Sequence, residues 1–243
     1  MRYAIISDIH GNYAALKEVV RDIKTRKIDH TISLGDVVGY GPQPHECIAL
    51  LRSNKIISVL GNHDAGVIGE ANLWQWRREA LITWSDARKK LTNEDITWLR
   101  RNPYYFVTDD FMCVHGTPKQ PTVEYMHDKH IAYSNLNYMM RNICFVGHTH
   151  VPKVLMKANG QDTFINRPLY TLMNVSPSKM YFINPGSVGQ PRDLDSRASY
   201  IVYDTQLKTI ILRRVAYNIQ KTQRLIFSRN YPPMLANRLS GGW

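Results

Sequence analysis

The beginning of the chain alternates short apolar runs with segments whose apolar residues recur at helical spacing. Apolar runs predict buried strands at Ala4–Ile6, Thr31–Leu34 and Ile56–Leu60. The segments between them, Tyr13–Arg26 and Pro44–Arg52, repeat apolar side chains every three or four residues and predict helices. This β-α-β-α-β order predicts a largely parallel sheet with right-handed crossovers.

The rest of the chain predicts two helices, a series of strands and two final helices. A tryptophan-rich helix is expected over Asn72–Leu91, and a capping box at Thr92–Asp95 opens a second helix to Arg100. Strands follow in chain order at Tyr104–Val107, Phe111–Val114, Ile143–Val146, Val154–Met156 (with a turn at Asn159-Gly160), Met180–Ile183, Tyr200–Tyr203 and Thr209–Leu212. The C-terminal segment predicts two helices, and the second begins at Pro232-Pro233.

These elements together predict an α/β fold with two stacked sheets and helices outside. We expect a single domain over residues 1–243, because no linker is long enough to separate two. It would carry a helical insert at about residues 66–101 and a helical C-terminal tail at about residues 218–243. The tryptophans of the insert are interpreted as packing anchors. The insert and the tail would either roof a site or serve as packing or as a dimer surface.

Composition is that of an ordinary globular protein, with 44% hydrophobic and 21% charged residues. No apolar run is long enough to span a bilayer, and the N-terminus lacks the apolar core of a signal peptide. We therefore expect a cytoplasmic protein with no membrane partner. Cys47, Cys113 and Cys144 show no CxxC spacing, so they predict neither a disulfide framework nor a thiolate zinc site.

The charge of the chain is strongly positive, since 31 Lys and Arg against 20 Asp and Glu give +11. Such a charge makes nucleic acid a candidate partner. The basic residues, however, are scattered as pairs such as Arg77-Arg78 and Lys89-Lys90, without a basic stripe. A generally positive surface that attracts small anionic substrates explains the charge at least as well.

Residues that can bind metal follow five of the predicted strands, usually beside a glycine. In chain order the segments are Asp8-Ile9-His10, Gly35-Asp36, Gly61-Asn62-His63-Asp64, Val114-His115-Gly116 and Gly147-His148-Thr149-His150. Ligands bind at the carboxyl ends of strands in open α/β sheets. Each segment alone is typical of a turn or a helix start, but the five in order predict a metal site.

The types of ligand restrict the choice of metal. Carboxylate with imidazole and no thiolate suits Mn, Fe, Zn, Co or Ni. Seven candidates are too many for one tetrahedral ion and suit two ions that share a bridge. His148 and His150 are spaced i and i+2, which would place them on one face if the chain stays extended.

The ordered set DxH, GD, GNHD, VHG and GHTH resembles the calcineurin-like metallophosphoesterase superfamily, over Asp8 to His150. The segments SDIHGN, GDVVGYGPQP and NPGSVGQPRD are most similar to its small bacterial and archaeal phosphodiesterase or phosphatase branch and extend the resemblance to about Ser199. The resemblance implies a four-layer αββα fold, in which a two-sheet β-sandwich is flanked by helices.

The resemblance also implies two divalent metal ions, with manganese first and Fe, Ni, Zn, Co or Mg as alternatives. By position, one ion would be bound by Asp8, His10 and His150, the other by Asn62, His115 and His148, and both by Asp36 as a bridge. His63 would face the substrate as a phosphate-oxygen donor or as a general acid. Asn12 and Arg192 would contact substrate phosphate, although Arg192 is equally well explained as a surface arginine, and Arg197 is a further candidate.

The chain departs from the GDxVDRG segment of the superfamily's protein phosphatases at two positions. Gly39 stands where the carboxylate that orients the catalytic histidine is expected, and Tyr40 stands in place of a phosphate-binding arginine. These departures disfavour a protein serine/threonine phosphatase. They leave open what orients His63, with Asp64 or a backbone carbonyl as candidates.

The sequence therefore favours a phosphoesterase that hydrolyses a small phosphodiester, nucleotide or phosphomonoester by in-line attack of a metal-bridging hydroxide, with His63 assisting. A nuclease is the alternative motivated by the charge of +11. A non-catalytic scaffold of the same fold is the third hypothesis, but such a protein should lack ligands, and none of the seven is missing here.

Overall fold

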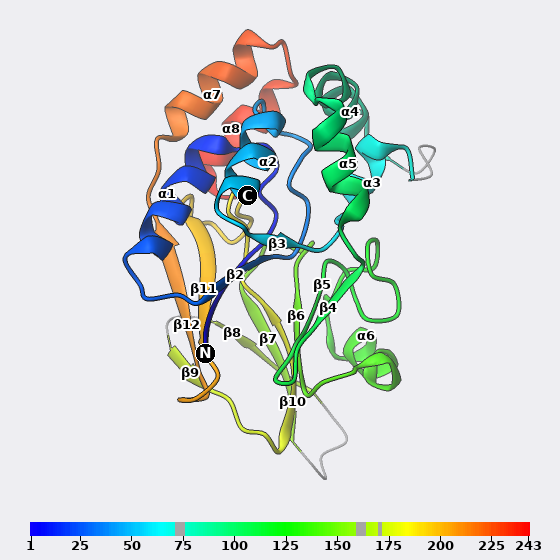
Figure 1. Ribbon diagram of the computed structural model, residues 1–243, viewed down its shortest axis with the longest axis vertical. Coiled ribbons are helices and arrows are strands. Elements are labelled where there is room, and N and C mark those ends of the chain that lie inside the picture. The colour runs from blue at the N-terminus through cyan, green and yellow to red at the C-terminus, as the bar shows by residue number, and fades with distance from the viewer. Residues whose placement is uncertain (71–75, 159–163, 170–171) are drawn as a thin grey trace.

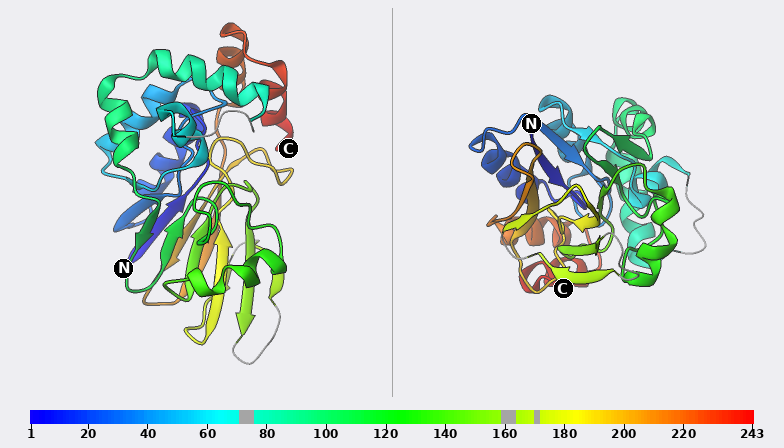
Figure 2. Two further views of the ribbon diagram at one scale, coloured as in Figure 1. Left: turned by 90° about the vertical axis from the view of Figure 1, so that its right-hand side faces the viewer. Right: turned by 90° about the horizontal axis from the view of Figure 1, so that it is seen from below.

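The computed structural model describes residues 1–70, 76–158, 164–169 and 172–243. The strands of these residues form two six-stranded sheets that stack on one another, with helices on the outer faces (Figures 1 and 2). This arrangement confirms the predicted α/β sandwich with helices outside. No helix in these ranges combines the length and the apolar character that crossing a membrane requires.

The first sheet contains the parallel strands of the β-α-β-α-β unit. In spatial order its strands are β3 (Ile57–Ser58), β2 (His30–Ser33), β1 (Arg2–Ile6), β11 (Ala198–Asp204), β12 (Thr209–Val215) and β9 (Leu172–Asn174). The pairs β1–β2 and β2–β3 are parallel, and α1 (Tyr13–Lys24) and α2 (Pro44–Ser53) connect them. The other pairs of this sheet are antiparallel.

The second sheet combines a parallel centre with antiparallel edges. In spatial order its strands are β4 (Tyr105–Val107), β5 (Met112–Val114), β6 (Ile143–Val146), β10 (Lys179–Asn184), β7 (Lys153–Ala158) and β8 (Ile165–Pro168). The neighbours β5, β6 and β10 run parallel. The short helix α6 (Lys129–Ser134) and a 3₁₀ turn (Leu136–Tyr138) cover the outer face of this sheet.

Apolar clusters of buried side chains hold these layers together. Ile5 of β1 and Phe145 of β6 belong to the cluster between the two sheets. Ala4 and Ile6 of β1 point to the other face, where they pack against α1 and α2. Because neighbouring residues of a strand face opposite sides, a stretch that is buried on both sides is apolar throughout, as β1 is from Tyr3 to Ile6.

The remaining helices lie on the same side of the first sheet as α1 and α2. They are α3 (Asn62–Ile68), α4 (Arg78–Lys90), α5 (Asn93–Arg101), α7 (Ile219–Ser228) and α8 (Pro233–Gly241). The helix expected over Asn72–Leu91 begins only at Arg78 within the described residues, and Trp74 and the turn at Asn159-Gly160 lie outside them. The sequence pattern did not predict α3, β8 or β9.

The predicted capping box is present at the start of α5. The Thr92 hydroxyl accepts a hydrogen bond from the Asp95 N–H at 3.2 Å, and the Asp95 carboxylate accepts one from the Thr92 N–H at 2.9 Å.

We expect Thr92→Ala to lower the free energy of unfolding by about 1 kcal/mol, because it leaves an N–H of the first turn unpaired. Urea denaturation measures this loss.

Thr97→Ala is the matched control for this prediction. Thr97 lies in the same helix, and its hydroxyl donates only to the Asn93 carbonyl in the part of the chain that the structure describes. The control should change the free energy of unfolding by less than about 0.5 kcal/mol. Equal losses in the two variants would contradict a specific role for the cap.

Candidate metal centre

Seven polar side chains meet at one end of the sandwich, where parallel strands of both sheets end. In order of the preceding strand they are Asp8 and His10 after β1, Asp36 after β2, Asn62 after β3, His115 after β5, and His148 and His150 after β6. All seven are buried. The structure thus brings together every residue that the strand-end pattern singled out as a metal ligand.

Five of these residues have a backbone in the left-handed region. Their φ angles are 53° at Asp8, 49° at His10, 52° at Asp36, 66° at His148 and 62° at His150. Non-glycine residues seldom adopt this conformation, which costs about 1–3 kcal/mol and concentrates at functional sites. The pair of histidines after β6 is therefore not extended, and the two rings do not share one direction.

The side chains form two groups that Asp36 joins. In the first group, His150 Nε2 lies 3.3 Å from Asp8 Oδ1 and 3.1 Å from His10 Nε2. Asp36 Oδ2 lies 3.6 Å from His10 Nε2 on one side and 3.4 Å from His115 Nε2 on the other. The same carboxylate oxygen therefore faces both groups.

The second group surrounds the ring of His115. Its Nε2 lies 2.7 Å from Asn62 Oδ1 and 3.2 Å from His148 Nδ1. Asp36, His115 and His148 thus offer ligand atoms within 4.8 Å of one another, as do Asp8, His10 and His150. His148 and His150 consequently belong to different groups, although only one residue separates them.

Four of the histidines are held by backbone carbonyls on the side that faces away from the centre. The contacts are His10 Nδ1 to Val38 O at 3.2 Å, His115 Nδ1 to Leu34 O at 2.8 Å, His148 Nε2 to Val123 O at 3.2 Å and His150 Nδ1 to Gln190 O at 2.6 Å. Because a carbonyl only accepts, each ring donates its N–H outward. In the neutral ring the inward nitrogen then carries a lone pair, as a metal ligand requires.

Burial dominates the charge state of the centre. It raises the pKa of Asp8 to about 6 and lowers the pKa values of His10 and His150 well below the usual range. Burial alone would also lower the pKa of His115, but the neighbouring Asp36 carboxylate raises it to about 9. Conversely, burial would raise the pKa of Asp36, and the charge of His115 holds it below its usual range.

Two carboxylate oxygens of the centre have no hydrogen-bond partner among the described residues. They are Asp8 Oδ2 and Asp36 Oδ2, and both are inaccessible to solvent. Buried carboxylates are normally paired or coordinate a metal. The donor set of carboxylate, carboxamide and imidazole, with lone pairs directed inward, fits divalent cations such as Mn²⁺, Fe²⁺ or Zn²⁺.

His63 differs from the other histidines of the centre in its hydrogen bonding. It lies at the start of α3, where its N–H donates to Asp36 Oδ1 at 2.8 Å. Its ring Nδ1 accepts a hydrogen bond from the indole Nε1 of Trp84 at 2.9 Å. Burial lowers the pKa of its imidazole to about 4. His63 also forms a close triplet of ligand-type atoms with His10 and Asp36.

Asp64, one of the two candidates for orienting His63, has other partners. Its carboxylate accepts from the backbone N–H groups of Val37, Val38 and Gly61 at 2.9, 3.1 and 3.1 Å. Asp64 therefore ties the loop after β2 to the start of α3. The partner of the His63 ring is instead Trp84, which the sequence pattern assigned to packing alone.

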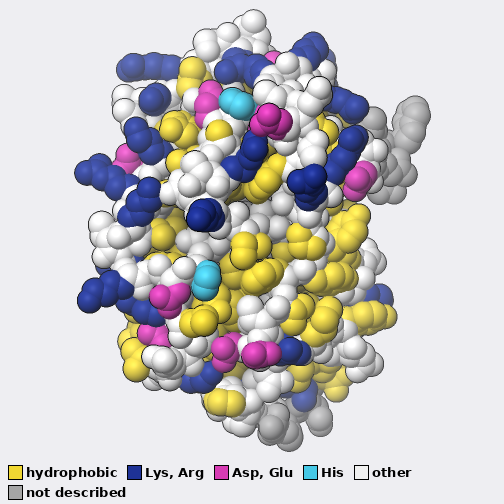
Figure 3. Space-filling model, viewed as in Figure 1, with side chains coloured by type: hydrophobic (Ala, Val, Ile, Leu, Met, Phe, Trp, Pro, Cys, Tyr) yellow, Lys and Arg dark blue, Asp and Glu magenta, His cyan; other side chains and the backbone are white. Residues whose placement is uncertain are grey.

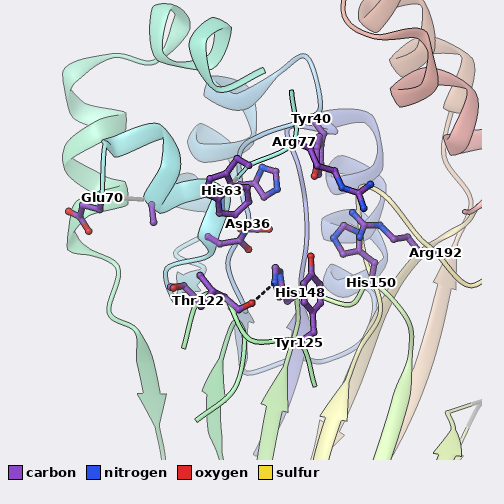
Figure 4. A pocket seen from close by; sticks show the side chains of 14 residues that line it. Asp36, Tyr40, His63, Glu70, Arg77, Thr122, Tyr125, His148, His150 and Arg192 are labelled. Carbon is purple, nitrogen blue, oxygen red and sulfur yellow. Dashed lines mark hydrogen bonds between the residues drawn. The ribbon is translucent and has the colours of Figure 1, made fainter. Parts of the chain in front are cut away.

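A pocket of about 380 Å³ opens over the centre (Figure 4). Asp36, His63, His148 and His150 are among the residues that line it. The ring of Tyr125 stacks on His148 with centroids 3.7 Å apart. The lining of the pocket thus combines aromatic rings with the polar side chains of the centre.

Two arginines reach the same pocket. The first is Arg192, which was predicted as a substrate contact. Its Nη2 donates to Gln190 Oε1 at 2.8 Å, and its Nε is buried without a partner among the described residues. Arg77 lines the pocket directly before α4. Figure 4 shows the two side chains approaching the pocket from different parts of the chain. In the sequence Arg77 is distinguished only by its place in a basic pair with Arg78.

Asn12 does not line this pocket, in contrast to its predicted contact with substrate. Its amide donates to the Gly189 carbonyl at 2.8 Å and to the Tyr217 hydroxyl at 3.2 Å. Its oxygen accepts from the Ala15 N–H at 3.3 Å and from the Thr222 hydroxyl at 2.8 Å. The side chain therefore caps α1 and joins it to α7, and these four hydrogen bonds occupy all of its polar groups.

Comparison with known proteins agrees with this geometry. The calcineurin-like phosphoesterase superfamily domain matches residues 1–208. An uncharacterised protein of Methanocaldococcus jannaschii is 36% identical over 241 residues, which cover 97% of this chain and 96% of that protein. The symmetrical bis(5'-nucleosyl)-tetraphosphatase of Pectobacterium carotovorum is 31% identical over 118 residues, which cover 45% of this chain and 40% of the enzyme.

A solved structure is also similar over the whole chain. The metallophosphoesterase from Sphaerobacter thermophilus superposes with a TM-score of 0.89 at 37% sequence identity, covering 100% of this chain and 99% of the other. The four-layer αββα arrangement that the resemblance implied is thereby confirmed. The chain belongs to the calcineurin-like phosphoesterase superfamily and is a phosphoesterase of that family of hydrolases.

Proposed function

We propose that this phosphoesterase uses two divalent metal ions to hydrolyse a small phosphodiester, nucleotide or phosphomonoester. The observation that carries this proposal is the position of Asp36, whose Oδ2 has no hydrogen-bond partner among the described residues and lies 3.6 and 3.4 Å from imidazoles of the two groups. A carboxylate in this position suits a bridge between two cations.

Each group would hold one ion. Asp8, His10 and His150 would bind the first ion, Asn62, His115 and His148 the second, and Asp36 both. Two bound cations would supply Lewis acidity and lower the pKa of bound water. The protein would contribute rigid positions, because the outward N–H of each ligand histidine is fixed by a carbonyl. Manganese is the first metal to test.

The pocket supports a small substrate. Its volume of about 380 Å³ is in the range of sites for small molecules. Arg77 and Arg192 give the pocket two cationic groups that suit phosphate oxygens, and His63 faces the same space. The relative from Pectobacterium carotovorum is named for hydrolysis of a dinucleoside tetraphosphate, a small phosphorylated substrate of this kind.

The face of the molecule seen in Figure 3 does not favour a polynucleotide. On the face seen in Figure 3, Lys and Arg side chains are spread over the helical part and are separated by apolar and uncharged side chains. A strand of nucleic acid is bound by a continuous positive groove. We therefore assign the net charge of +11 to general attraction of small anions.

A hydrolysis panel tests the proposed activity. Bis- and mono-(p-nitrophenyl) phosphate, cyclic nucleotides and dinucleoside polyphosphates would each be assayed with Mn, Ni, Fe, Zn and Mg. We expect metal-dependent turnover of a small ester and no cleavage of single- or double-stranded nucleic acid. Cleavage of polynucleotides alone would establish the nuclease, and no hydrolysis after metal loading would favour the scaffold.

The two-ion arrangement predicts that His148→Ala and His150→Ala each weaken a different ion. Anomalous diffraction of crystals soaked in Mn²⁺ would show one peak for each of the two ions in the parent protein. Each variant would lose a different one of these peaks. His130→Ala is the control, because His130 is an exposed histidine on α6. Loss of the same peak in both variants would contradict this assignment.

The arginine assignment predicts a rise in KM for Arg192→Gln of about 10-fold or more, since a hydrogen bond to a charged group is worth roughly 1.5–3 kcal/mol. Arg197→Gln is the control. Arg197 is exposed, pairs with Asp195 at 2.6 Å and does not line the pocket. Steady-state kinetics measures both variants, and an equal KM in the two would remove Arg192 from the binding site.

A further inference from the structure

The ring of His63 receives its hydrogen bond from a donor, whereas the four other histidines of the centre give theirs to acceptors. Trp84 Nε1 donates to His63 Nδ1 at 2.9 Å. An indole N–H has no lone pair to offer, so the direction of this bond is not in doubt. Nδ1 of His63 must therefore be unprotonated.

We propose that Trp84 is the positioning residue of His63: its indole N–H fixes the ring and places the imidazole proton on Nε2. A neutral imidazole has one N–H and one lone pair. With the lone pair of Nδ1 directed at Trp84, Nε2 carries the proton and presents an N–H donor at the pocket. This proposal rests on the proposed phosphoesterase function, in which the donor would meet a phosphate oxygen.

The direction of the hydrogen bonds separates the five histidines into two kinds. In His10, His115, His148 and His150 the outward N–H bonds a carbonyl, so that in the neutral ring, the form that binds a metal, the inward nitrogen has the lone pair. His63 has the opposite arrangement, because the nitrogen that faces the pocket carries the proton. Although His63 lies close enough to Asp36 and His10 to complete a third triplet, a protonated nitrogen does not ligate a metal. His63 is thus a hydrogen-bond donor and not a ligand.

Two glycines leave the space that the contact between Trp84 and His63 requires. A Cβ at Gly39, where φ is +85°, would lie 2.3 Å from His63 Nδ1, on the atom that accepts from Trp84. A Cβ at Gly66 would lie 2.4 Å from Cη2 of the Trp84 ring. Gly39 is also the position where a carboxylate partner of the histidine is expected in the protein phosphatases of the superfamily. The insert helix α4 therefore supplies the partner that the loop after β2 lacks.

The change from carboxylate to indole alters what His63 does. A carboxylate accepts a hydrogen bond from Nδ1–H and so favours a ring protonated on both nitrogens, which is able to release the Nε2 proton to a leaving group. The indole N–H opposes that state, because two donors would then face each other. His63 of this chain accordingly stabilises charge on a phosphate oxygen by a hydrogen bond.

The decisive experiment replaces the indole N–H of Trp84 by sulfur, using β-(3-benzothienyl)alanine, which keeps the size and shape of the side chain. The metal-loaded protein is then assayed on the best small ester. We expect kcat to fall roughly tenfold, with KM and metal content unchanged, since the His63 ring is then no longer held with its Nε2–H directed at the phosphate oxygen and its hydrogen bond in the transition state is weakened.

The same substitution at Trp98 is the matched control. Trp98 is half-buried on α5, packs against the same apolar cluster as Trp84 and does not line the pocket. It should leave kcat unchanged. Gly66→Ala is a second variant, because it retains the indole but displaces its ring while improving the helix propensity of its position. It should lower kcat to a similar extent.

The tautomer itself is measured by two-bond ¹H–¹⁵N NMR on Zn²⁺-loaded protein, with the His63 signals assigned by their loss in His63→Asn. The proposal expects a protonated Nε2 in the parent protein, and a mixture of tautomers in the sulfur variant. A protonated Nδ1 in the parent, or a fall in kcat with an unchanged tautomer, overturns it. An inactive parent protein with a protonated Nε2 would instead refute the proposed function and leave the role of Trp84 established.

Discussion

The buried carboxylate of Asp36 is the interaction on which the rest of the centre depends. Its Oδ1 accepts the backbone N–H of His63, and its Oδ2 lies between the rings of His10 and His115. Its carbonyl also accepts the N–H of His10 at 2.8 Å. One residue therefore aligns the loop after β1, the start of α3 and the loop after β5. Removing its charge would leave the groups around it without a common partner.

The arrangement requires a backbone that is unfavourable in isolation. Five of the seven candidate ligands have positive φ, and only a surrounding structure that holds the loops in place can maintain such strain. The apolar clusters on the faces of both sheets provide this support, because the strands that lead into the loops, β1 and β2 in the first sheet and β6 in the second, are packed against these clusters. The stable sandwich and the strained loops are consequently parts of one design, in which burial offsets the cost of positioning.

The sequence pattern predicted the sandwich and the candidate ligands because both signals are local. An apolar run that ends in Asp-x-His or Gly-Asp is visible within about ten residues, and parallel strands must place their carboxyl ends together. Helix α3 was missed because its seven residues begin with the polar side chains Asn62, His63 and Asp64 and contain Gly66. This pattern resembles a loop. The sequence could not show what Asn12 contacts, because a helix N-terminus attracts either a substrate or another part of the chain, and here Thr222 of α7 and Tyr217 bond its side chain.

The sequence by itself thus determined the fold, the family and the set of residue types at the centre, each of which follows from short segments in order. Only the tertiary structure decided which atoms of those residues meet. Trp84 lies 21 residues from His63 and on another helix, and Arg77 reaches the pocket where Asn12 does not. Hydrogen-bond partners of this kind depend on how separate helices pack, and side-chain packing leaves no periodic signal along the chain.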